Sequence, residues 1–202
     1  MDKQIDARGL ACPQPVILTK KALEEPAITS LVTIVDNTTA RDNVLKLAGH
    51  LNCSSSVAET EDGFRITIKK SAEAGFNLQA VCQPLDFASG GDGTVLMITS
   101  RYFGQGNEEL GAKLMGSFLY TQVEDDTPPV AVLLANSGAY LSCIGSNVLE
   151  HLQALAGKGC QVLTCGTCLD FYGLKEQLAV GEVTNMYTIA EKLKGAAKII
   201  NL

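Results

Sequence analysis

Two groups of cysteines in the sequence have the residue types and spacing for thiol chemistry, and the first lies near the start. Cys12 is followed at once by Pro13-Gln14-Pro15. Proline is tolerated in the first turn of a helix, because the N–H that it lacks would have no partner there. If Pro13 is the first helical residue, Cys12 is the N-cap, and its sulfur faces backbone N–H groups and the positive end of the helix dipole. That setting favours the reactive thiolate; the alternative is a buried, unreactive cysteine beside a rigid turn.

The second group is Cys165-Gly166-Thr167-Cys168, which follows an apolar run. A pair with this spacing that opens a helix after a strand is typical of a redox dithiol. The pair is also half of a structural zinc site, but the chain has only two histidines and no second Cys-x-x-Cys to complete one. We therefore expect no metal. The remaining alternative is two small residues that pack where a strand meets a helix.

Arg101 is the only arginine after residue 70, and it is expected at the end of a strand. It could supply positive charge to a thiolate there, or pair with an acidic side chain at the surface. Gly104-Gln105-Gly106, just beyond it, lacks the third glycine and the lysine of phosphate-binding loops, so we interpret it as a turn. We expect no bound cofactor.

The composition is that of a globular protein, with 46% hydrophobic and 19% charged residues among 202. No run approaches the roughly 20 apolar residues of a membrane span, so no membrane association is expected. The N-terminal residues lack the apolar core of a secretory signal, which predicts a cytoplasmic location. Seven cysteines, an odd number, do not suggest a secreted disulfide framework.

The net charge of −6 lies entirely in the second part of the chain. Residues 1–70 carry nine basic and nine acidic groups, whereas residues 71–202 carry seven and thirteen. Neither part contains a basic run, and the chain has no tryptophan and only 5% aromatic residues. Nucleic acid is therefore not an expected partner.

The pattern of the first 70 residues predicts a β-α-β-α-β-β order, with two helices on one face of a four-stranded sheet. We expect this domain to span residues 1–72. Its predicted elements are a strand at 3–8, a helix from Cys12 that ends at Pro26, a strand at 31–36, a helix opened by a capping box at Thr39, a weak strand at 55–60, the hairpin turn Asp62-Gly63 and a strand at 64–68.

Residues 73–93 are rich in glycine and small polar residues and are interpreted as a linker. From residue 94 to 202, strands alternate with helices, which predicts an open parallel sheet covered on both faces. The predicted elements are strands at 95–98, 130–135, 161–165, 179–180 and 198–200, a helix from Asn107 that buries Leu110, Leu114, Met115, Phe118 and Leu119, a helix capped by Ser146, and a helix around Ile189.

Stretches 100–106, 136–140 and 165–170 each follow one of the first three strands of that sheet. In open parallel sheets, ligands and catalytic groups gather at the carboxyl ends of the strands. We therefore expect Arg101, the segment after the second strand and the cysteine pair to meet at one edge.

The segment Asp6-Ala7-Arg8-Gly9-Leu10-Ala11-Cys12-Pro13-Gln14-Pro15 resembles the signature of the TusA/SirA sulfur-carrier family. The resemblance covers residues 3–70. It implies a small β-α-β-α-β-β domain in which Cys12 accepts and donates sulfur as a persulfide. Arg8, Pro13 and Pro15 are candidate substrate-binding residues of that site.

The second half resembles the DsrE/DsrF-like family, which has a flavodoxin-like, three-layer fold and handles sulfur. The segment Cys165-Gly166-Thr167-Cys168-Leu169, with Gly173 beyond it, carries this resemblance and implies Cys165 as the sulfur-handling thiol. Cys168 is additional to the family pattern. The two domains together are similar to the fusion proteins called YedF, which are assigned to sulfurtransferase-like selenium metabolism. DsrE-like domains often assemble, which makes a homo-oligomer through this domain an expectation.

The leading hypothesis is a chalcogen carrier that takes sulfur or selenium on Cys12, with Cys165 and Cys168 as further catalytic candidates and Arg101 as a candidate substrate-binding residue. Its partners would be sulfur or selenium donor and acceptor proteins, and it would be a sulfurtransferase-like carrier at most. One alternative is a dithiol oxidoreductase or redox regulator that uses Cys165 and Cys168. Another is a non-enzymatic binding module that docks through its acidic second domain.

Overall fold

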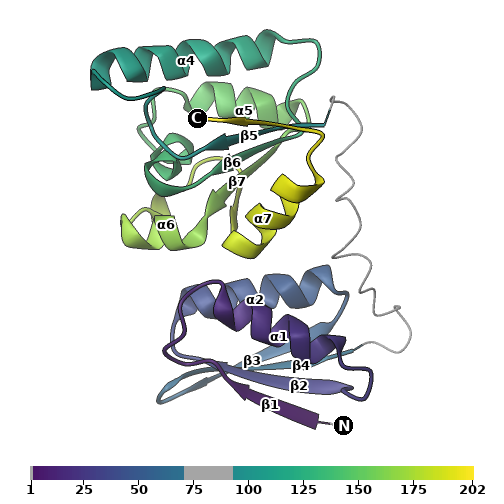
Figure 1. Cartoon of the computed structure of the whole chain (residues 1–202). Helices are drawn as coiled ribbons and strands as arrows, with labels where there is room; N and C mark the ends of the chain where they lie inside the picture. The colour runs from purple at the N-terminus through teal and green to yellow at the C-terminus, as the bar shows by residue number, and fades with distance from the viewer. Residues whose placement is uncertain (1, 71–92) are drawn as a thin grey trace. The chain divides into compact units, whose positions relative to one another are not determined.

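The computed structural model describes residues 2–70 and 93–202, and these belong to two compact units. We call residues 2–70 the first unit and residues 93–202 the second unit, and describe each by itself (Figure 1). Nearly all of the predicted linker, together with Cys82, lies outside the described residues.

The first unit is a four-stranded sheet with both helices on one face, which confirms the predicted two-layer fold (Figure 1). The strand order is β1-β2-β4-β3, in which β1 runs parallel to β2 and the other pairs are antiparallel. The elements are β1 Asp2–Asp6, α1 Gln14–Glu24, β2 Ser30–Val35, α2 Thr38–His50, β3 Ser54–Thr60 and β4 Gly63–Lys69.

The hydrophobic pattern explains why β2 is central and β3 is at the edge. In β2, every second residue is buried (Leu31, Thr33 and Val35), whereas every residue of β3 is exposed. The turn from β3 into β4 requires glycine, since Gly63 has a φ of 131° and a Cβ there would lie 2.2 Å from the Val35 carbonyl oxygen. The predicted hairpin is therefore confirmed.

Helix α2 begins one residue before the predicted capping box, so Thr39 is not its cap. The N-cap is Asn37, whose side-chain oxygen accepts a hydrogen bond from the Ala40 N–H at 2.8 Å. Asparagine is a stronger N-cap residue than threonine, and Asn37 lies two residues after the end of β2.

The second unit is a five-stranded, fully parallel sheet with helices on both faces, as predicted. The strand order is β8-β7-β6-β5-β9, so the first strand of the unit lies between the second and the last. In flavodoxin itself the first strand lies between the second and the third. The strands are β5 Thr94–Ile98, β6 Ala131–Leu134, β7 Gln161–Cys165, β8 Glu182–Thr184 and β9 Lys198–Asn201.

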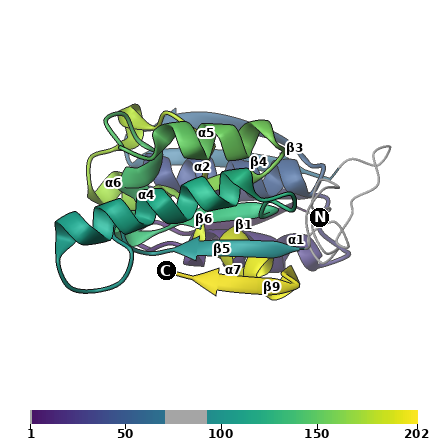
Figure 2. The ribbon, with the colours of Figure 1, turned by 90° about the horizontal axis from the view of Figure 1, so that it is seen from above.

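Helices α4 (Glu108–Glu124) and α5 (Leu149–Gly157) lie side by side on one face of this sheet (Figure 2). Both helices pack against β5 and β6 through the buried side chains of Met115, Leu119 and Leu152. Helix α7 (Met186–Gly195) covers the opposite face through Ile189. The short helices η1 (Asn136–Ser142), α6 (Gly166–Phe171) and η2 (Lys175–Gln177) follow β6 and β7.

Three predictions for this unit are wrong. Ser146 does not cap a helix, because α5 begins at Leu149 and its N-cap is Val148. Ala179 and Val180 are not a strand, because their N–H groups both donate to the carbonyl oxygen of Ser142, at 2.9 and 3.2 Å. The fourth strand is β8, which comes after a turn at Gly181. On α4, Leu110 and Leu114 are 55% and 43% exposed, since the helix turns Gly111, Met115 and Leu119 toward the sheet.

None of the helices in the described part of the chain is both long and apolar enough to cross a membrane.

Candidate functional site

Cys12 is half-buried and lies just before α1, but it is not the N-cap, so that prediction is wrong. The N-cap is Pro13, and Pro15 occupies the second helical position. The Gln14 N–H donates to the carbonyl oxygen of Ala11 at 2.9 Å. Prolines at 13 and 15 and the engaged N–H of Gln14 reduce the number of donors that the helix start can offer to a sulfur.

The loop that carries Cys12 is fastened to the end of β2. Ala7 is fully buried, and its N–H donates to the carbonyl oxygen of Ile34 at 2.8 Å. Gly9 has a φ of 72°, and its N–H donates to the Asp36 carboxylate at 2.6 Å. That hydrogen bond, with a second from the Asn37 side chain, lowers the pKa of Asp36. These contacts fix the path of residues 7–9 toward the cysteine.

Arg8 is engaged by carboxylates. Its guanidinium donates to both oxygens of Asp6, at 2.9 and 2.6 Å, and lies 3.6 Å from the Asp62 carboxylate. The hydrogen bonds from Arg8 lower the pKa of Asp6 to about 2. The structure therefore places Arg8 in a surface ion-pair network, and its role in substrate binding stays a prediction.

Asn43 is a polar residue of this site that the sequence analysis missed. It is only 2% exposed, and its side-chain NH₂ donates to the sulfur of Cys12 at 3.9 Å. A buried amide next to a sulfur supplies a donor that solvent cannot replace. The available signal was its spacing, since Asn43 lies four residues before the buried Leu47 and so shares the inner face of α2.

In the second unit, the three predicted stretches do meet at the carboxyl ends of β5, β6 and β7. The Arg101 N–H donates to the Ser137 hydroxyl at 3.3 Å, which joins the loop after β5 to η1. The Asn136 N–H donates to the sulfur of Cys168 at 3.1 Å, which joins η1 to α6. Helix η1 can approach the end of β5 closely because residue 138 is glycine. A Cβ at Gly138 would lie 2.4 Å from the Ile98 carbonyl oxygen.

The two cysteines of the Cys-x-x-Cys segment have different surroundings. Cys165 ends β7 and is 2% exposed, and burial raises the pKa of its thiol to about 11. Cys168 is half-buried on α6 and accepts the Asn136 N–H. Both are free thiols in this structure. Of the two sulfurs, that of Cys168 is therefore the more accessible, and it accepts a hydrogen bond from a backbone N–H.

Asn136, which holds Cys168, is itself held in place. Its φ of 48° lies in the left-handed region, which asparagine adopts more readily than most residues. Its side-chain oxygen accepts a hydrogen bond from the Tyr172 hydroxyl at 2.8 Å. The ring of Tyr172 packs on that of Tyr140 with centroids 5.0 Å apart. The sequence predicted this segment but not its contact with the sulfur.

The other described cysteines are buried. Cys143 donates to the Ala139 carbonyl oxygen at 3.3 Å, and burial raises its pKa. Burial also raises the pKa of Cys53, and it raises that of Cys160 to about 12. These thiols stay protonated and enclosed at neutral pH, which makes them poor nucleophiles.

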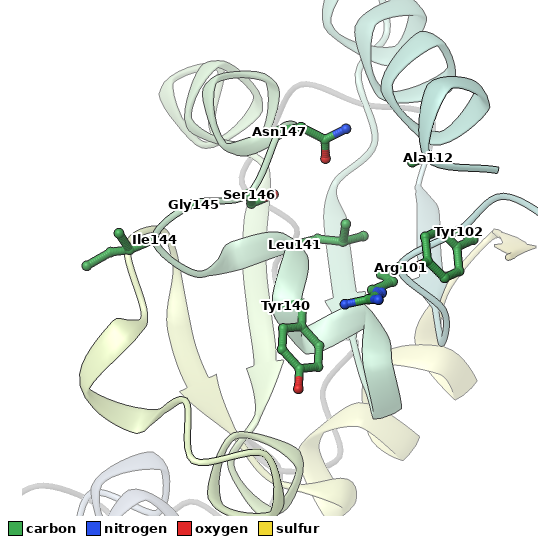
Figure 3. Close-up of a pocket in the computed structure, with 9 residues that line it drawn as sticks. All are labelled: Arg101, Tyr102, Ala112, Tyr140, Leu141, Ile144, Gly145, Ser146 and Asn147. Carbon is green, nitrogen blue, oxygen red and sulfur yellow. The ribbon is translucent and has the colours of Figure 1, made fainter. Parts of the chain in front are cut away.

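Arg101 lies between two tyrosine rings, with its guanidinium carbon 4.9 Å from the ring centre of Tyr102 and 5.4 Å from that of Tyr140. Within residues 2–70 and 93–202 no acidic side chain forms an ion pair with it. The guanidinium borders a pocket of about 280 Å³ (Figure 3). Leu141, Ser146 and Asn147 also line this pocket.

Among the described residues, His, Cys, Asp and Glu side chains form no group of three or more that could hold a metal ion. The zinc interpretation of the cysteine pair therefore gains no support from this part of the chain.

Comparison with known proteins matches each unit to a sulfur-related family. A model of the family described as sulfurtransferase TusA matches residues 3–70, and a model of the DsrE/DsrF-like family matches residues 130–202. A Methanocaldococcus jannaschii protein named "putative sulfur carrier protein" is 41% identical over 70 residues, which are 34% of this chain and 93% of that protein.

Several solved structures are also similar. A SirA-like protein from Desulfitobacterium hafniense is 36% identical over 34% of this chain and 97% of its own, with a TM-score of 0.32. The ychN protein of E. coli is 14% identical over 54% of this chain and 98% of its own, with a TM-score of 0.40. A Methanobacterium thermoautotrophicum protein of unknown function is 16% identical over 54% of this chain and 97% of its own, with a TM-score of 0.41.

The family resemblance of both halves is therefore confirmed. The chain belongs to the TusA sulfurtransferase family through residues 3–70, and it carries a DsrE/DsrF-like domain in its C-terminal part.

Proposed function

We propose that this protein is a carrier that accepts sulfur, or selenium, on Cys12 and exchanges it with donor and acceptor proteins. The observation that carries the proposal is the sulfur of Cys12, which is half-buried at the start of α1 and accepts a hydrogen bond from the buried amide of Asn43. Membership of the TusA family supports a sulfur-transfer role for this cysteine.

The chemical step that this site would perform is an exchange at a persulfide. The Cys12 thiolate attacks the outer sulfur of a donor persulfide, R–S–SH. A sulfur–sulfur bond forms at Cys12, the donor's sulfur–sulfur bond breaks, and the donor leaves as the thiolate R–S⁻ with the bonding electron pair. The proton stays on the transferred sulfur. The product is Cys12 persulfide, and the reverse attack by an acceptor thiolate unloads it.

Asn43 would act as a positioning residue in this step. An amide N–H donates a hydrogen bond to a thiolate but does not protonate it, so the nucleophile is oriented and stays reactive. Because Asn43 lies on α2 and Cys12 precedes α1, their contact also depends on the packing of the two helices. The pair therefore ties the reactive sulfur to the core of the first unit.

The second unit would supply the other end of a relay. The family resemblance assigns the sulfur-handling role to Cys165, and we propose that the pair acts together, with Cys168 as the entering nucleophile. Support comes from the exposure of Cys168 and the burial of Cys165. Since both units belong to one chain, each thiol is present near the other at a raised effective concentration.

A second candidate function is a dithiol oxidoreductase that uses Cys165 and Cys168. The specific observation in its favour is that the thiol of Cys168 lies close enough to that of Cys165 to influence its pKa. In this function an oxidant would take two electrons, and two protons would leave as the disulfide forms. A reversible Cys165–Cys168 disulfide that Cys12→Ser does not affect would favour it over the carrier.

The test of the carrier proposal is intact mass spectrometry of the full chain after incubation with cysteine persulfide. We expect the chain to gain the mass of one or more sulfur atoms, and Cys12→Ser to lose the gain on the first unit. Cys53→Ser is the matched control, because Cys53 is a buried thiol of the same unit. If Cys12→Ser loads as fully as Cys53→Ser does, the role given to Cys12 is wrong.

A further inference from the structure

The pocket beside Arg101 has a charge that differs from that of the surrounding unit. Residues 94–202 contain seven basic and ten acidic side chains. Arg101 is the only charged residue among those that line the pocket. The carboxylate of Glu108, at the start of α4, accepts a hydrogen bond from the Tyr102 hydroxyl at 2.8 Å and is engaged there. The pocket is therefore a positive site in an acidic unit.

The two tyrosine rings hold the guanidinium in place. Cation–π contact with Tyr102 and Tyr140 positions the guanidinium at the pocket, and within residues 2–70 and 93–202 no acidic side chain forms an ion pair with it (Figure 3). Tyr102 is itself fixed, since the adjacent Phe103 N–H donates to the Gly111 carbonyl oxygen at 3.0 Å on α4. A guanidinium held in this way can bind an oxyanion through two parallel hydrogen bonds.

The rest of the lining limits the size and character of a ligand. Ser146 and Asn147 place a hydroxyl and an amide at the pocket, and Leu141 and Ile144 give it an apolar side. A volume of about 280 Å³ has room for a small anion or a molecule the size of one amino acid.

The same short helix joins this pocket to the thiol of Cys168. In helix η1, the Asn136 N–H donates to the sulfur of Cys168, and Tyr140, four residues later, lines the pocket. Four residues of 3₁₀ helix span about 8 Å. Tyr172, which holds Asn136, packs on the ring of Tyr140. A continuous set of contacts therefore leads from the pocket, through Tyr140 and Tyr172, to the residue that holds the sulfur of Cys168.

We propose that this pocket binds the oxyanion group of a small sulfane-sulfur donor, with Arg101 as its anchor, and presents the donor's outer sulfur to Cys168. The chemistry rests on the proposed function, since it makes the second unit the entry point of the relay. With thiosulfate, the Cys168 thiolate bonds to the outer sulfur, the sulfur–sulfur bond of thiosulfate breaks, and sulfite leaves with the electron pair. With a cysteine persulfide, the carboxylate is the anchored group and a cysteine thiolate leaves.

Calorimetric titration of the full chain carrying Cys12→Ser and Cys168→Ser, which removes both proposed sulfur acceptors, with thiosulfate, cysteine persulfide and sulfate tests binding without transfer to these thiols. We expect at least one donor to bind, and Arg101→Gln to weaken it at least tenfold, since a bidentate charge-assisted pair is lost. Arg101→Lys keeps the positive charge but cannot donate two parallel hydrogen bonds. Its donor affinity should therefore lie between that of the wild type and that of Arg101→Gln. Lys113→Gln is the matched control, because this exposed cation of α4 pairs with Glu109 and does not line the pocket.

The two sources of the oxyanion are separated by the titration itself, since thiosulfate and cysteine persulfide are titrated in turn. Mass spectrometry of Cys168→Ser separates binding from transfer, because this variant should bind the donor but gain no sulfur in the second unit. Unchanged donor affinity in Arg101→Gln overturns the inference, as does sulfate that binds as tightly as either donor. Sulfur loading of Cys12 from a different donor is measured in Arg101→Gln as well. If Cys12 still loads there, the proposed function holds whatever the titration says about the pocket.

Discussion

The difference between Cys165 and Cys168 predicts a large difference in alkylation. Burial raises the pKa of Cys165 from its ordinary value of 9.0 to about 11. A raised pKa keeps the group as a thiol, so at pH 8 its thiolate fraction is about 100-fold smaller than that of a thiol at the ordinary value. Because the side chain is 2% exposed, restricted access slows it further. We expect Cys165 to react with iodoacetamide at least about 100-fold more slowly than an unhindered thiol of ordinary pKa.

The assay is alkylation of the full chain over time, followed by digestion and quantification of each cysteine peptide. The Cys165 rate should rise about tenfold for each pH unit from 7 to 10 and level off only near pH 11. Because one digestion could place both cysteines in the same peptide, Cys168→Ser and Cys165→Ser are measured separately. Cys160, whose pKa burial raises to about 12, is the internal control and should be slower still.

Two alkylation rates at pH 8 decide the matter: that of Cys165 in the Cys168→Ser variant and that of Cys168 in the Cys165→Ser variant. Equal rates would refute this reasoning. The burial of Cys165 would then not restrict its reactivity, and the order of attack proposed for the pair would have no support. A Cys165 rate that levels off below pH 9 would refute the raised pKa by itself, independently of access.

Three further predictions concern single contacts. Asn43→Ala should slow sulfur loading of the first unit about 2- to 10-fold, the worth of one hydrogen bond, as measured by time-resolved intact mass; an unchanged rate removes Asn43 from the site. Asp6→Asn should remove stability that the wild type has above pH 4 and loses as pH falls toward 2, because the Arg8 pairing lowers the pKa of Asp6; thermal unfolding at pH 7 and pH 2.5 checks the sign. Gly138→Ala should destabilise the second unit by about 1–3 kcal/mol in urea unfolding, while Gly157→Ala, whose added Cβ meets no atom within 4 Å, should not; equal midpoints would contradict the close approach.

Local signals predicted much of the fold. Strand β7 has the predicted bounds, and the Asp62-Gly63 turn and the Asn107 cap of α4 lie where the sequence placed them. These features depend on a few neighbouring residues, such as a glycine in a turn or a side-chain oxygen before a helix. The meeting of three loops at one sheet edge was also predictable, because it follows from parallel strand topology.

Features that depend on contacts between distant segments were not predictable in this way. Ala179 and Val180 have the composition of a strand, but their N–H groups are taken by Ser142, which is far away in sequence. The Asn43 contact with Cys12 joins residues 31 apart, and no local pattern encodes it. The unequal burial of Cys165 and Cys168 likewise depends on how α6 packs after β7. Spacing identified the candidate residues, and only the packing shows that their surroundings differ.

The most direct test of the central claim is to locate the transferred sulfur on the chain. The full chain is exposed briefly to cysteine persulfide, trapped with an alkylating reagent and digested, and each cysteine peptide is analysed for one added sulfur. The account predicts that the peptide containing Cys12 carries the added sulfur, and that peptides containing the buried Cys53, Cys143 and Cys160 do not. A Cys12 peptide that never carries added sulfur, while the chain as a whole does, would contradict it.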